Sequence, residues 1–280
     1  MKAPPAAKKA KSDINHFDEQ RQKIEAVLRE IASKIASLAK QNAHNRMERA
    51  LFNATSELQF YGDVTIEQSP SDAIAAAVEA SSKHFADDQH IVIFVDGSLV
   101  WKPNGTSDSI AHLGAAVVYK SLNGSQGWEE RRYFATSKER NSQKAELFAI
   151  AQGAAVAIEL IERLERQNSR CSGKKATSYR VTIFSDYQHA LRQMKHLWEK
   201  NSDVKAQVCS DPNIYELIMR SQSLHQIGVH LELCWVPGHM RVEGNVRADE
   251  AAQQAAKTQG ITVPADKGPQ WIELEVSSKE

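Results

Sequence analysis

The stretch Ile91-Val92-Ile93-Phe94-Val95-Asp96-Gly97-Ser98 decides the fold of this chain. Its apolar, mostly β-branched residues predict a buried strand that ends at Asp96. A second run of the same kind, Val181-Thr182-Ile183-Phe184-Ser185, ends at Asp186. A carboxylate at the end of a buried strand is costly unless a partner neutralises its charge. Two such strands therefore predict that carboxylates converge on a site for hard divalent cations, which prefer oxygen ligands.

The rest of the pattern extends these two strands into a layered fold. The element order is β-β-β-α-β-α-α-β-α, in which three successive strands indicate an antiparallel meander and the later alternation indicates parallel additions. We therefore expect the α/β class, with a mixed sheet flanked by helices. The expected strands are residues 91–96, 113–119, 130–136, 180–185 and 229–235, and the expected helices are residues 142–165, 187–199, 211–226 and 243–258.

Composition indicates the class of protein and its compartment but does not identify a binding partner. The chain has 280 residues, 41% of them apolar, and a formal net charge of zero, so global charge does not predict nucleic-acid binding. Its three cysteines are far apart and lack CxxC spacing, which argues against a disulfide framework or a zinc site. No apolar run approaches the ~20 residues of a membrane span, and no secretory signal is visible at the N-terminus. We expect an intracellular protein, in the nucleus or cytoplasm, without a membrane partner.

The N-terminal part has its own texture. Four lysines among alanine and proline in residues 1–13 predict a disordered basic tail. Apolar residues from Phe17 to Leu38 follow a near-heptad spacing, which indicates an amphipathic helix. That helix would either pair two chains as a short coiled coil, giving a homodimer, or pack on its own domain, and the pattern leaves both open. Residues 53–70 resemble a mixed linker, and a second helix is expected at about 71–85.

Two further acidic residues and one loop complete the pattern. Glu146 lies in Ala145-Glu146-Leu147 near the start of the long helix, and Asp249 lies in the helix that follows Trp235-Val236-Pro237-Gly238-His239. With Asp96-Gly97-Ser98 and Ser185-Asp186, these motifs occur in the order seen in type 1 ribonuclease H. The chain resembles in particular the ribonuclease H domains of non-LTR retrotransposon polyproteins. The resemblance covers roughly residues 90–258, and the run from Gly238 to Asp249 is its most specific part.

The resemblance implies a fold, a reaction and a metal site. The fold would be a ribonuclease H-like, five-stranded mixed sheet flanked by helices, here with an N-terminal helical extension. The activity would be endonucleolytic cleavage of the RNA strand of an RNA/DNA hybrid by two-metal hydrolysis, with two Mg²⁺ ions, or with Mn²⁺ in their place. By motif, the metal-binding and catalytic carboxylates would be Asp96, Glu146, Asp186 and Asp249, and His239 would be the catalytic histidine of a mobile loop.

The domain organisation and the substrate contacts follow from the same reading. We expect a basic tail at 1–13, a helical extension at 14–88, the ribonuclease H-like catalytic domain at 89–258 and a loosely held C-terminal tail at 259–280. Basic side chains that could meet phosphates are Arg131, Arg132, Lys138, Arg140 and Lys144. Polar side chains that could read the hybrid are Ser98, Asn141, Ser142, Gln143, Gln188 and Asn245.

Other interpretations of the same residues are available. Asp96 alone would be a turn residue before Gly97, and Asp186 alone would be a helix cap. The whole chain would then be a catalytically silent nucleic-acid-binding module or a coiled-coil interaction protein. Four clustered carboxylates argue against a pure binder, because negative charge repels phosphates. We therefore favour the nuclease.

Overall fold

The computed structural model describes residues 59–82, 89–103, 109–122, 127–135, 141–171, 178–199, 211–258 and 271–274. These residues fall within one compact unit, Glu57–Glu280. The predicted basic tail and the predicted amphipathic helix between Phe17 and Leu38 lie outside the described residues, and so do Lys138 and Arg140.

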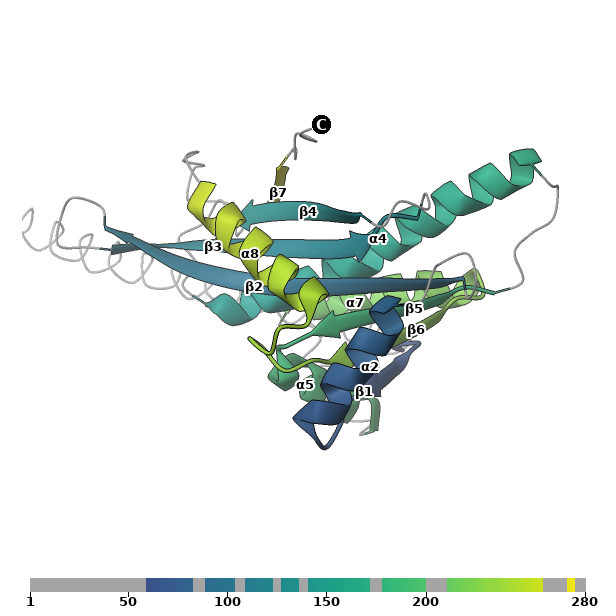
Figure 1. Cartoon of the computed structure of the whole chain (residues 1–280), viewed down its shortest axis with the longest axis horizontal. Helices are drawn as coiled ribbons and strands as arrows, with labels where there is room; N and C mark the ends of the chain where they lie inside the picture. Colours follow the sequence, from purple (N-terminus) through teal and green to yellow (C-terminus); the bar gives the residue numbers. More distant parts are fainter. Residues whose placement is uncertain are drawn as a thin grey trace, which may run out of the picture. The chain divides into compact units, whose positions relative to one another are not determined.

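The described strands form one seven-stranded sheet with the order β1-β6-β5-β2-β3-β4-β7 (Figure 1). The predicted mixed sheet is confirmed: the β2–β3, β3–β4 and β4–β7 pairs are antiparallel, and the β2–β5, β5–β6 and β1–β6 pairs are parallel. The predicted number of five strands is wrong, because a short strand is added at each edge. The strands are β1 (Asp63–Thr65), β2 (His90–Pro103), β3 (Ser109–Lys120), β4 (Trp128–Ala135), β5 (Arg180–Ser185), β6 (His230–Trp235) and β7 (Trp271–Leu274).

Helices cover both faces of the sheet, as expected. Side chains alternate along β2, so Ile93 and Val95 point to one face and Phe94 points to the other. The first face packs against α4 and α7, and the second packs against α2 and α8. The described helices are α2 (Pro70–Ser82), α4 (Ser142–Cys171), α5 (Gln188–Glu199), α7 (Pro212–Gln226) and α8 (Glu243–Thr258).

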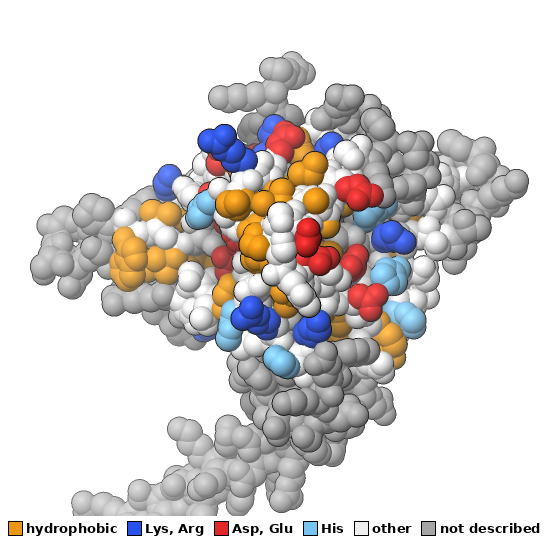
Figure 2. All heavy atoms as spheres, turned by 60° about the horizontal axis from the view of Figure 1, so that its bottom comes forward, with side chains coloured by type: hydrophobic (Ala, Val, Ile, Leu, Met, Phe, Trp, Pro, Cys, Tyr) orange, Lys and Arg blue, Asp and Glu red, His pale blue; other side chains and the backbone are white. Residues whose placement is uncertain are grey.

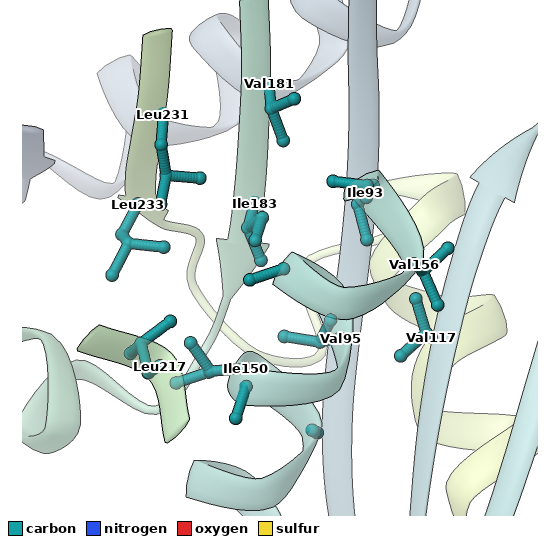
Figure 3. Packing of buried hydrophobic residues seen from close by; sticks show 14 of the residues in the cluster. Ile93, Val95, Val117, Ile150, Val156, Val181, Ile183, Leu217, Leu231 and Leu233 are labelled. Carbon is teal, nitrogen blue, oxygen red and sulfur yellow. The ribbon is translucent and has the colours of Figure 1, made fainter. Parts of the chain in front are cut away.

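The larger core lies under α4. Figure 3 shows Ile150 and Val156 among side chains of the sheet, with Leu217 of α7 beside Ile150. Ile93, Ile150 and Leu217 are almost completely buried. Burying one such side chain contributes about 1.5–3 kcal/mol. The core therefore holds the first turns of α4 firmly against β2, and this fixes the backbone around Glu146.

The two edge strands were missed by the sequence reading. β1 pairs with β6 through Asp63 and Glu232 and lies in the stretch predicted as a linker. β7 pairs with β4 and lies in the stretch predicted as a loosely held tail. Trp271 of β7 stacks on Phe148 of α4 with the ring centroids 4.0 Å apart. These contacts attach both segments to the sheet although each strand is short.

The surface of the unit is mixed in charge. Figure 2 shows acidic, basic and histidine side chains interspersed with apolar ones on the face turned to the viewer, in keeping with the formal net charge of zero. Within the described part of the chain, none of the helices is both long and apolar enough to cross a membrane.

Candidate active site

The candidate site lies where β5 ends and its longer neighbour, β2, continues. β2 and β5 are parallel, and their last paired residues are Val95 and Ser185. Asp96 and Asp186 come immediately after this pair, so both carboxylates lie at the same end of adjacent strands. Among the described strands, β2 continues beyond this point paired with β3 alone, which leaves its other edge without a neighbouring strand beside Asp96. The convergence of Asp96 and Asp186 that the two buried strands predict is therefore present, and their role as cation ligands stays a prediction.

Glu146 reaches this edge from the first turns of α4. The backbone N–H of Gly97 donates a hydrogen bond of 3.0 Å to Glu146 Oε2. A Cβ at residue 97 would run into the backbone of α4 and would lie 2.7 Å from Glu146 Cα. Glycine is therefore what allows helix and strand to approach so closely. The side-chain oxygens of Asp96, Glu146 and Asp186 lie within 4.8 Å of one another.

Burial and mutual repulsion make these carboxyl groups poor acids. Asp96 is only 5% exposed, and burial, followed by the charges of Asp186 and Asp249, raises its pKa to about 8. Burial and the charge of Asp96 raise the pKa of Glu146 well above its usual range. Burial also raises the pKa of Asp186, against the hydrogen bond from Asn245. Three converging carboxylates that are costly to ionise alone fit a hard divalent cation, which would supply the missing positive charge.

Asp249 and His239 lie at the margin of this cluster. Asp249 on α8 is outside the group of three, yet its charge contributes to the raised pKa of Asp96. Its Oδ1 accepts a hydrogen bond of 2.8 Å from Gln253 Nε2. His239 is exposed in the loop between β6 and α8, and its charge opposes the rise in the pKa of Asp186. Its φ of 57° and that of Arg241, 60°, are unusual for residues other than glycine.

The residues predicted to read the substrate fall into two groups. Ser98 lies two residues beyond Asp96 on the open part of β2 and is partly exposed, and Gln188 begins α5 two residues after Asp186 and is also partly exposed. Asn141, Ser142 and Gln143 are exposed at the start of α4, where Asn141 Oδ1 caps the helix by accepting from Gln143 N–H at 3.0 Å. All five residues are close in sequence to one of the three carboxylates and are accessible to solvent.

Asn245 does not belong with them. It is 3% exposed, and its side chain hydrogen-bonds to Asp186. A side chain buried to this extent is poorly placed for the direct substrate contact that its motif predicts.

Two of the predicted phosphate-binding arginines are occupied by carboxylates. Arg131 Nη2 lies 2.6 Å from Glu159 of α4, and Arg131 Nη1 lies 3.7 Å from Glu273 of β7. Arg132 forms an ion pair with Glu130 on the same strand. Arg131 therefore bridges β4, α4 and β7, which is a structural role that the sequence did not suggest.

Two contacts that shape the site were not predicted from the sequence. A Cβ at Gly238 would lie 2.7 Å from Asp186 Oδ2, so the backbone of the histidine loop packs directly on that carboxylate. Trp128 of β4 donates from Nε1 to Glu243 Oε1 at 2.9 Å, which ties the first turn of α8 to the sheet. The Pro237-Gly238 pair was a visible signal for the first contact. The sequence offers no local signal for the second.

The sheet and the converging carboxylates define the class: an α/β protein with a candidate cation site where β5 ends beside β2. The family model for RNase H matches residues 88–257, which is more than half of the chain. The chain belongs to the RNase H family. The finer resemblance to non-LTR retrotransposon polyproteins stays a prediction.

Several solved RNase H structures are similar to this chain. RNase H1 from the archaeon Halobacterium salinarum has 17% sequence identity and a TM-score of 0.37, covering 61% of this chain and 99% of that chain. The N-terminal RNase H domain of a Mycobacterium tuberculosis protein has 18% identity and a TM-score of 0.36, covering 60% and 94%. The RNase H domain of prototype foamy virus has 16% identity and a TM-score of 0.37, covering 60% and 94%. A search of curated proteins finds no match.

Proposed function

We propose that this chain is a metal-dependent endonuclease that hydrolyses the RNA strand of RNA/DNA hybrids. The observation that carries the proposal is the set of three carboxylates within 4.8 Å of one another, contributed by β2, α4 and β5 in a member of the RNase H family. The motif around each of the three predicts a metal-binding carboxylate. Their convergence supports a common role better than the separate roles of turn residue for Asp96 and helix cap for Asp186.

The proposed roles follow from position and charge. Asp96, Glu146 and Asp186 would hold divalent cations, Mg²⁺ or Mn²⁺, and Asp249 would join them from α8. A pair of such cations supplies an activated water and stabilises the leaving oxygen of a phosphodiester. His239, exposed in the loop next to Asp186, would accept or donate a proton as product leaves.

Recognition of the hybrid would fall to accessible polar groups beside the carboxylates. Ser98 and Gln188 each follow a metal-binding aspartate by two residues, and the polar run from Asn141 to Gln143 leads into the helix of Glu146. Neutral donors and acceptors of this kind can bond a 2′-hydroxyl, which distinguishes RNA from DNA. We therefore propose these five residues as substrate contacts.

A cleavage assay tests the proposal. The purified full chain is incubated with an end-labelled RNA/DNA hybrid and Mg²⁺, beside the variants Asp96→Asn and Asp186→Asn, with duplex DNA and duplex RNA as further substrates. We expect cleavage of the RNA strand of the hybrid by the wild type and its loss in both variants. Glu250→Gln is the matched control, because Glu250 is an exposed acid on α8 next to Asp249.

Two results would contradict the proposal. A wild-type protein that binds the hybrid but cleaves it with neither Mg²⁺ nor Mn²⁺ would be a binding module. Cleavage that survives both substitutions would place the chemistry elsewhere in the chain.

A further inference from the structure

Asn245, the third residue of α8, is a buried amide directly beside the candidate metal site. It is 3% exposed, and its side chain hydrogen-bonds to the carboxylate of Asp186. An ionised carboxylate can accept hydrogen bonds but cannot donate them, so the amide N–H of Asn245 must be the donor. The hydrogen bond stabilises the ionised form and opposes the rise in the pKa of Asp186.

The amide oxygen of Asn245 shows that the contact with Asp186 fixes the orientation of the amide. Asn245 Oδ1 is buried and has no hydrogen-bond partner among the residues that the structure describes. Turning the amide over would point its oxygen at the carboxylate and create repulsion. An unpaired buried acceptor is unfavourable and calls for an explanation. The explanation here is that the N–H to Asp186 decides how the amide lies.

Two glycines bring the surrounding backbone close enough for this contact. Gly244 packs against the ring of Phe94, and a Cβ there would run into that ring. The first turn of α8 therefore lies close to the sheet, and Asn245 follows at the next position. Gly238 packs on Asp186 Oδ2, since a Cβ there would lie 2.7 Å from that oxygen. The segment from Gly238 to Asn245 thus contacts the Asp186 carboxylate at both of its ends.

We propose that Asn245 is a positioning residue that holds Asp186 in the orientation needed to bind metal. This inference rests on the proposed metal site and replaces the expectation that Asn245 contacts substrate. The affinity of the protein for a divalent cation therefore depends on Asn245 even when no nucleic acid is present. A substrate contact would affect hybrid binding and leave metal binding unchanged.

The test is a double-mutant cycle on metal binding. Mn²⁺ is titrated into the metal-free full chain by calorimetry, for the wild type, Asn245→Ala, Asp186→Asn and the double variant. Removing the partner that orients a metal ligand costs about 10- to 100-fold in metal affinity. We expect a loss of this order for Asn245→Ala in the wild type and little further loss in the Asp186→Asn background. Equal losses in both backgrounds would overturn the proposal, since Asn245 would then act independently of Asp186.

A pair of exchanged side chains keeps the test decisive if Asn245→Ala does not fold. Asn245→Asp has the same shape but places a second carboxylate against Asp186, so the metal-free protein should melt at a lower temperature at neutral pH. Adding Asp186→Asn restores a donor and an acceptor, and the melting temperature should recover. Equal melting temperatures for Asn245→Asp and the exchanged double variant would overturn the direct contact. Val246→Ala is the control for α8, because Val246 is the exposed neighbour of Asn245 and should leave Mn²⁺ affinity unchanged.

The outcomes separate this proposal from the proposed function. A wild type that binds Mn²⁺ with the expected cycle but does not cleave hybrid supports the positioning role and contradicts the nuclease. A wild type that cleaves hybrid while Asn245→Ala keeps its Mn²⁺ affinity does the reverse. A wild type without measurable Mn²⁺ binding overturns the positioning role.

Discussion

Replacing Asp96 by asparagine should stabilise the metal-free protein while it abolishes cleavage. In the absence of metal, burial and neighbouring charges raise the pKa of Asp96 from 3.8 to about 8. The folded protein therefore holds Asp96 protonated at neutral pH, whereas the unfolded chain ionises it freely. Each pH unit between the two pKa values costs the folded state about 1.4 kcal/mol. About three such units separate the ordinary pKa from neutrality, which gives a cost of roughly 4 kcal/mol at about pH 7.

Asparagine removes this cost without removing the polar contacts of the site. In the wild type the Gly97 N–H, which donates to Glu146, also interacts with the Asp96 carboxylate, and the amide oxygen of asparagine can accept from it in the same way. In a domain of this size 1 kcal/mol moves the melting temperature by about 2–4 °C. We therefore expect Asp96→Asn to melt about 10 °C above the wild type by calorimetry in EDTA at neutral pH. Added Mg²⁺ should raise the melting temperature of the wild type and have less effect on the variant.

Thermal unfolding provides both the control and the result that would refute the reasoning. Glu250→Gln, an exposed change on α8, should move the unfolding free energy by no more than about 0.5 kcal/mol. A folded Asp96→Asn protein that melts with the wild type or below it in EDTA would refute the reasoning. Asp96 would then carry its charge in a compensated setting, and the site would not require a cation.

Three further predictions use the same purified protein. The metal-free wild type should lose stability as the pH rises from about 4 to about 8, because the raised pKa of Asp96 favours the protonated folded state. A melting temperature that rises across this pH range would contradict the prediction. Gly97→Ala should lower the affinity for Mn²⁺ at least about tenfold, because the added methyl group would push the backbone of Glu146 away. An unchanged affinity by calorimetry would mean that α4 moves freely. Trp271→Ala should lower the unfolding free energy by roughly 2–3 kcal/mol in urea, less than for a fully buried tryptophan because Trp271 is only partly buried on Phe148. A loss below about 0.5 kcal/mol would show that β7 adds little to the fold.

The core of the fold, including the elements that position Asp96, Glu146 and Asp186, was predictable from local pattern. The strands that carry Asp96 and Asp186 are continuous apolar runs, which is how parallel strands buried on both faces appear in a sequence. The helix that carries Glu146 has a long apolar periodicity and a polar start. The expected residues 142–165 fall within the observed Ser142–Cys171. Local pattern therefore located these elements, whereas the proposed role of Glu146 came only from the resemblance to ribonuclease H.

What was missed depends on contacts between distant residues. β1 and β7 have three and four residues, too short for a periodic signal, and β7 is held by the stack of Trp271 on Phe148. Arg131 looked like a phosphate contact because its partners, Glu159 and Glu273, are far away in sequence. Asn245 looked accessible for a similar reason. Its burial comes from how closely α8 lies on the sheet.

The two short edge strands bear on how this protein can be handled. The family match spans residues 88–257, so a fragment cut to that match would lack both β1 and β7. β6 and β4 would then become the outermost strands, each with a row of backbone N–H and C=O groups left without partners. Such bare edges pair readily with other chains and promote aggregation. The trimmed fragment should therefore be less soluble than the longer chain even if every carboxylate of the site is kept.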